Sequence, residues 1–252
     1  MENRSRSLNV LVAALLFTLN AAPLLAQQTT TVHLKKGQLI SLITSITKSG
    51  PEAEQLRGQY FQKMFPIAAG LGFKEEGSFV IEKFRTGDYK PYPAMSFFSW
   101  PNREAHKKFE NHPEWPQLQK MRASIWDELR VCQALVEQDI TLIFEQGRTY
   151  NVSFLWLNKN NPGDFKKYRD SMKQTVSELG GEYFLQLPGV SYHSFLEPSP
   201  PPDIILITEW PNPEAHQKYL QSEAFKKNVH YFQSGVAKFN SFSTTFHFPE
   251  PQ

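Results

Sequence analysis

The spacing of apolar residues changes several times along the second half of the chain. Residues 149–158 are rich in β-branched and aromatic side chains, which predicts a strand. Apolar residues then recur every three or four positions over 165–179, which predicts an amphipathic helix that ends at Gly180-Gly181. Residues 182–197 read as a strand bent near Pro188. The apolar run 203–210 predicts a central strand. A helix with an apolar stripe reaching Phe239 and a strand over 240–248 complete this half.

The first half follows the same order of elements. The pattern predicts strands over 38–47, 73–84, 94–100 and 136–144. A helix over 51–71 follows the first of these strands, and a second helix follows the third. Both halves therefore read β-α-β-β-α-β, which is the ferredoxin-like order.

A repeated segment relates the two halves directly. Seven of the ten residues from Trp100 to Phe109 recur identically from Trp210 to Tyr219. We predict an α+β protein of two tandem ferredoxin-like units, residues 33–147 and 148–249. Each sheet needs its second face covered, so we expect the two sheets to pack against each other within one chain, as an intrachain dimeric α/β barrel.

Most of the repeated segment serves to end a strand and begin a helix. Asn102 and Asn212 are good N-caps, and the two tryptophans are expected to pack as core at the strand ends. Helix formation does not require a histidine one turn later, yet His106 and His216 stand there. The positive end of the helix dipole favours a neutral imidazole at this place. These histidines are either inherited structural residues or pocket residues.

The second copy resembles the domain-of-unknown-function family thirteen-thirty, a member of the dimeric α/β-barrel superfamily. The residues that match its pattern are Trp210, Pro211, Asn212, Glu214, Ala215, Tyr219, Ser222, Glu223 and Phe225. His106 and His216 depart from the small residue that the pattern has at their position. The resemblance implies sheets that pair face to face. The superfamily includes cofactor-independent monooxygenases, ring-modifying enzymes of aromatic catabolism and haem proteins related to chlorite dismutase.

The N-terminal segment and the net charge indicate the location of the protein and the partners that it lacks. Arg4 and Arg6, an apolar stretch and several alanines make residues 1–26 a predicted signal peptide, so we expect a periplasmic or secreted protein with no membrane anchor after cleavage. Without those residues the net charge is +1, which offers no signature for nucleic acid. The single cysteine, Cys132, lies in an apolar context and is expected to be buried and inert.

Two interpretations of the chemistry stay open. One is a binding protein whose aromatic pocket holds a small apolar or aromatic ligand, with no cofactor and no metal. The other is a cofactor-independent or haem-using oxidoreductase or isomerase. The sequence shows no nucleophile motif, no phosphate loop and no local metal spacing. We place the candidate ligand site in the second half, at Trp210, His216, Tyr219 and, from the bent strand, His193.

Overall fold

The computed structural model describes residues 28–86, 92–194 and 199–248. The predicted signal peptide lies outside these residues, as do parts of both proline-containing loops. The strands are β1 Thr29–Leu34, β2 Leu39–Thr47, β3 Lys74–Thr86, β4 Ala94–Trp100, β5 Trp126–Leu135, β6 Ile140–Glu145, β7 Thr149–Leu157, β8 Glu182–Leu187, β9 Gly189–Ser194, β10 Ile204–Trp210 and β11 Val236–His247. The helices are α1 Pro51–Gly70, α2 Arg103–Glu110, α3 Trp115–Ile125, α4 Asp164–Glu178, α5 Pro213–Gln221 and α6 Glu223–Gly235. No helix in the described part of the chain is long and apolar enough to cross a membrane.

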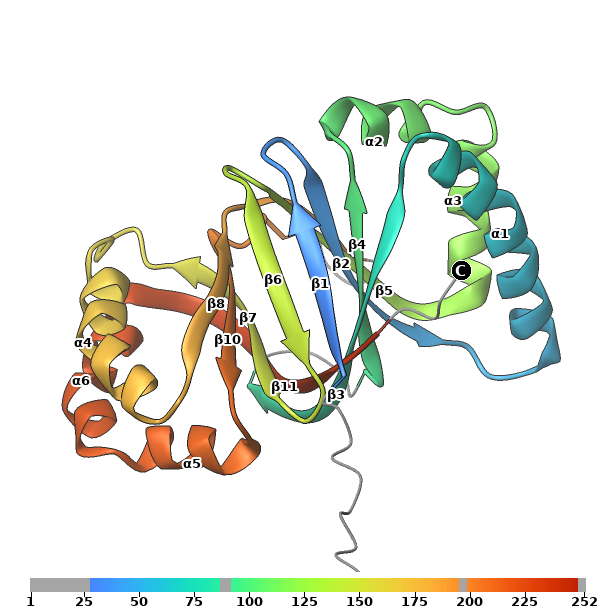
Figure 1. Ribbon diagram of the computed structural model, residues 1–252. Helices are drawn as coiled ribbons and strands as arrows, with labels where there is room; N and C mark the ends of the chain where they lie inside the picture. The colour runs from blue at the N-terminus through green and yellow to red at the C-terminus, as the bar shows by residue number, and fades with distance from the viewer. Residues whose placement is uncertain (1–27, 87–91, 195–198, 249–252) are drawn as a thin grey trace, which may run out of the picture.

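Nine strands form one antiparallel sheet in the order β8-β10-β7-β11-β3-β4-β2-β5-β9. The first unit contributes β3-β4-β2-β5 and the second contributes β8-β10-β7-β11, and each order is that of a ferredoxin-like sheet. Helices α1 to α3 cover one unit and α4 to α6 cover the other, with the strands between them (Figure 1). The predicted fold class, two tandem ferredoxin-like units forming an intrachain α/β barrel, is confirmed.

Two strands pass from one unit's sheet to the other's. The first part of β3 pairs with β4, and its later part pairs with β11 of the second unit. In the second unit the same course is divided at Pro188: β8 pairs with β10, and β9 pairs with β5 of the first unit. Proline has no N–H to give to a strand ladder, so the break falls there.

A two-stranded sheet completes the barrel. β1 and β6, each preceding the first strand of a unit, pair with each other. Their inward side chains, Val32, Leu34, Leu142 and Phe144, join an apolar core to which strands of both units contribute. Figure 1 shows the pair standing between the two sets of strands. Buried apolar side chains from both units and from this strand pair therefore meet in one core.

The structure corrects two predicted elements. The fourth strand of the first unit is β5 rather than 136–144; that region holds the turn after β5 and strand β6. The sequence pattern did not predict β5, because charged residues usually indicate an exposed segment. In the structure Glu128 and Arg130 are buried and form an ion pair at 2.6 Å. The last helix ends at Gly235, so the apolar stripe reaching Phe239 crosses into β11.

The strand-to-helix signals were predicted correctly. The side chains of Asn102 and Asn212 accept hydrogen bonds from the amides of Ala105 and Ala215, at 2.8 and 2.9 Å. Trp100 and Trp210 are buried in the cores beneath the helices. Cys132 is buried as expected, and burial raises the pKa of its thiol.

The seam between β3 and β11 gives a test of the fold. Gly77 has φ +141°, and a Cβ there would collide with the ring of Phe246 and lie 2.8 Å from the carbonyl oxygen of His247. We predict that Gly77→Ala lowers the free energy of unfolding by about 2 kcal/mol or more. Gly58→Ala is the control: it is exposed in α1 with open space around it, and alanine should stabilise that helix by about 0.5–1 kcal/mol. Urea denaturation measures both, and equal effects would contradict this description of the seam.

Candidate ligand-binding site

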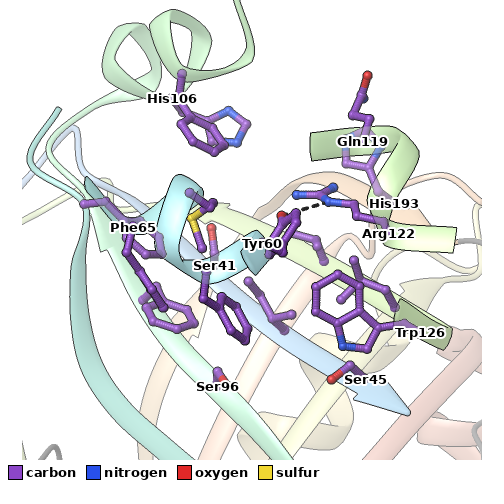
Figure 2. Close-up of a pocket in the computed structure, with 18 of the residues that line it drawn as sticks. Ser41, Ser45, Tyr60, Phe65, Ser96, His106, Gln119, Arg122, Trp126 and His193 are labelled. Carbon is purple, nitrogen blue, oxygen red and sulfur yellow. Dashed lines mark hydrogen bonds between the residues drawn. The ribbon is translucent and has the colours of Figure 1, made fainter. Parts of the chain in front are cut away.

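A cavity of about 560 Å³ lies in the first unit, between its sheet and its three helices. Side chains of β2, β3, β4 and β5 form the floor, and α1, α2 and α3 form the roof. Figure 2 shows its lining residues, among them Tyr60, His106, Arg122, Trp126 and His193. β9 of the second unit supplies His193 and Ser194, so both halves of the chain build the cavity.

Aromatic rings make up much of the cavity wall. Tyr60 of α1 meets Trp126 of β5 edge to face, with ring centroids 5.1 Å apart. Phe61 and Phe65 stack on each other at 5.1 Å. Phe65 is 37% exposed, which places an apolar ring between the cavity lining and solvent. Such a wall offers faces and edges against which a flat apolar molecule can pack.

His106 is held in one orientation in this cavity. The side-chain amide of Gln133 donates a hydrogen bond to His106 Nε2 at 3.0 Å, which leaves the imidazole proton on Nδ1. Nδ1 lies 3.6 Å from a carboxylate oxygen of Glu110, one turn further along α2. Burial lowers the pKa of His106, and the nearby His193 and Arg122 lower it further, against the raising effect of Glu110. The imidazole is therefore neutral at pH 7.

Gln133 is itself fixed by both halves of the chain. Its amide nitrogen also donates to Ser41 Oγ at 3.2 Å, and its carbonyl oxygen accepts from Ser191 Oγ at 2.5 Å. Ser191 lies on β9, directly opposite Gln133 in the pairing of β5 with β9. The crossing strand thus sets which end of the Gln133 amide faces His106.

A smaller cavity of about 120 Å³ lies at the corresponding place in the second unit. Trp210, His216 and Tyr219 all line it. His216 stacks on Trp210, with ring centroids 5.1 Å apart and planes 11° apart. The hydroxyls of Tyr219 and Tyr168 lie 2.5 Å apart, and burial raises the pKa of Tyr168 to about 12. The first unit has Tyr60, Trp100, His106 and Phe109 in the lining of its larger cavity, so these side chains alone do not account for the smaller volume.

The different helix packing explains the difference in volume. The amide of Trp126 donates to the carbonyl of Arg122 where α3 ends, and the amide of Val236 donates to the carbonyl of Phe232 where α6 ends. Ile125 therefore corresponds to Gly235. A Cβ on Gly235 would collide with the backbone nitrogen of Phe165, so α6 approaches α4 closely only because glycine stands there. In the first unit a fully buried isoleucine, Ile125, stands at this position.

The structure brings together three of the four residues predicted for the site. Trp210, His216 and Tyr219 meet in the small cavity, but His193 lines the large cavity of the other unit. Sequence reasoning missed Gln133, Glu110 and Arg122. Glu110 had a readable signal, because a carboxylate four residues after a histidine in a helix lies on the same face. Gln133 had none, since it reaches His106 only through the fold.

The residues present do not fit haem at His106. An axial ligand needs an imidazole nitrogen that faces the metal. Nε2 of His106 accepts the hydrogen bond of Gln133, and Nδ1 faces Glu110. Within residues 28–86, 92–194 and 199–248, no group of three or more His, Cys, Asp or Glu side chains is arranged to hold a metal ion.

The lowered pKa of His106 predicts a pH effect on stability. The folded-state pKa is below the ordinary value of about 6.5, so the unfolded chain binds the proton more readily. The contribution of His106 to the free energy of unfolding is therefore fully present above about pH 6.5, and it is lost as the pH falls through the folded-state pKa. Urea unfolding should thus show a steeper loss of stability from about pH 6.5 to about pH 5 in the native protein than in His106→Gln. Equal slopes, or an NMR titration of His106 at or above the ordinary value, would contradict the prediction.

Comparison with known proteins supports the fold. No family model matches the chain, and no curated protein matches it. Among solved structures, an anthrone oxidase-like protein is similar over 86% of this chain and 94% of its own, with 16% identity and a TM-score of 0.51. A mutant chlorite dismutase from Candidatus Nitrospira defluvii covers 84% of this chain and 92% of its own, with 9% identity and a TM-score of 0.43. A dimeric ferredoxin-like protein of unknown function from Bacteroides fragilis covers 41% of this chain and 100% of its own, with 13% identity and a TM-score of 0.28. At these identities the likeness concerns the fold alone: the chain has the fold of the dimeric α/β-barrel proteins.

Proposed function

We propose that the protein binds a small apolar or aromatic ligand in the cavity of the first unit. The observation that carries the proposal is the cavity of about 560 Å³, whose walls combine aromatic rings with polar side chains that could orient a ligand. Pockets for small ligands measure about 300–1,000 Å³ and have this kind of lining. The second cavity, of about 120 Å³, has room for only a few waters, each of which takes about 30 Å³ in the liquid. The site predicted at Trp210, His216 and Tyr219 stays a prediction beside this one.

Filling the cavity tests the proposal. Val131 lies on β5 in the cavity wall, and we predict that Val131→Trp weakens binding of naphthamide, a flat uncharged probe, about tenfold or more. The added ring would occupy the space that the probe needs. Isothermal titration calorimetry measures the dissociation constants.

Ile143→Trp is the matched control, because Ile143 is a β-branched strand residue that is 50% exposed on β6. It should bind the probe as the native protein does. His216→Ala belongs in the same series, because a loss confined to that variant would return the site to the second unit. No binding of the probe by the native protein would contradict the proposed function.

Acid–base catalysis without a cofactor is a second candidate function for the same cavity. The pairing of His106 with Glu110 at 3.6 Å favours it, because a carboxylate that faces one nitrogen stabilises the imidazolium formed when the other takes a proton. Nε2 would exchange its hydrogen bond from Gln133 for the acidic proton of a ligand. A ligand whose acidic C–H group lies between two aromatic rings would pack against the aromatic walls and could give its proton to His106.

Anthrone is the first substrate to try, since a structural neighbour is called anthrone oxidase-like. Its oxidation by dioxygen yields anthraquinone and water, and absorbance follows the product. We predict that His106→Gln lowers the rate about 100-fold or more, the usual share of a general base. His230→Gln, an exposed histidine on α6, should leave the rate unchanged. A native rate equal to that without protein would rule out this candidate with anthrone and leave the binding function standing.

We also propose that the protein is exported after loss of residues 1–26. The order of basic, apolar and small residues supports this, and N-terminal sequencing of the native protein tests it. The motif around Trp210 supports a relationship to the domain-of-unknown-function family thirteen-thirty. We also propose that the two ferredoxin-like units span residues 33–147 and 148–249, as the sequence repeat predicts.

A further inference from the structure

Arg122 is a cation in the cavity wall that has no carboxylate partner among the residues that the structure describes. Arg57, which also lines the cavity, lies 3.7 Å from Glu54. Arg122 makes one hydrogen bond within the described chain, from its Nε–H to the hydroxyl of Tyr60 at 3.0 Å. Its Nη groups therefore keep donors for a further acceptor.

The guanidinium group is held in place although it lacks an ion pair. Its carbon lies 4.6 Å from the ring centroid of Trp115 and 5.8 Å from that of Tyr60. Figure 2 shows Arg122 reaching from α3 across to Tyr60 among the lining side chains. Arg122 and His106 line the same cavity, and the charge of Arg122 contributes to the lowered pKa of His106. A cation fixed in this way is already oriented for a ligand.

The fold does not need an arginine at this position. Phe232 occupies the corresponding place on α6 and packs there against Tyr168 and Phe239. The second unit therefore closes its core with an apolar ring where the first unit has a half-buried charge. The difference coincides with the difference in cavity volume.

We propose that the ligand of this cavity is a flat aromatic molecule with one carboxylate group, which Arg122 binds; this rests on the proposed binding function. The planar fork of guanidinium donors matches the two oxygens of a carboxylate better than a single phenolate oxygen. Glu75 and Glu110 line the same cavity and would repel a doubly charged phosphate ester more strongly than a singly charged carboxylate. The ring system packs between Tyr60, Phe61 and Trp126.

Two probes of nearly equal shape test the charge. Naphthoate carries the carboxylate, and naphthamide replaces it with an uncharged amide. Calorimetry should show that the native protein binds naphthoate about tenfold or more tightly than naphthamide. Arg122→Gln should abolish that preference and leave the affinity for naphthamide within about twofold. Arg122→Lys keeps the charge without the fork, so it should retain part of the preference.

Lys120→Gln is the matched control, since Lys120 is exposed on the same helix and removal of its charge should leave the preference intact. Equal affinity of the native protein for the two probes would overturn the inference while leaving the binding function in place. An equal loss for both probes in Arg122→Gln would also overturn it, because it would assign Arg122 a structural role. If neither probe binds, the inference and the binding function fall together.

Discussion

The pairing of two strands across the unit boundary is the constraint on which the other features depend. The later part of β3 joins β11, and β9 joins β5, so each unit completes the sheet of the other. This closure buries one shared apolar core, to which strands of both units contribute. Both cavities described above lie on the opposite faces of the strands, under the helices. The same crossing brings Ser191 and His193 of the second unit to the cavity of the first.

The two copies of the unit have diverged at the helix that covers each sheet. Both keep the tryptophan, the asparagine cap and the histidine, and both histidines contact their tryptophan at 5.1 Å. Gly235 lets α6 approach α4, whereas Ile125 and Arg122 occupy the corresponding positions of α3. The second copy keeps a cavity of only about 120 Å³. The first copy keeps a cavity of about 560 Å³ that holds the oriented imidazole of His106 and the guanidinium of Arg122, which has no carboxylate partner among the described residues.

The sequence predicted what depends on neighbours along the chain. Period, caps and the repeat gave the ferredoxin-like order, the helix starts and the buried tryptophans, because each follows from local spacing. Strand β5 was not predicted, because the charged residues Glu128 and Arg130 are typical of an exposed segment, although in the structure they form a buried ion pair. The site escaped for a different reason: Gln133 reaches His106 only through the fold, and His193 reaches the first unit only after the break at Pro188. The close contact of Gly235 with α4, which accompanies the smaller cavity of the second unit, is also shown by no local pattern.

The position of a bound aromatic acid tests the account most directly. A crystal grown with a brominated naphthoate would show the bromine by its anomalous scattering. The account predicts one strong peak between the sheet of the first unit and helices α1 and α3, with the carboxylate within hydrogen-bonding distance of Arg122. A peak beside Trp210 and His216 in the second unit, or between the two sheets, would contradict it.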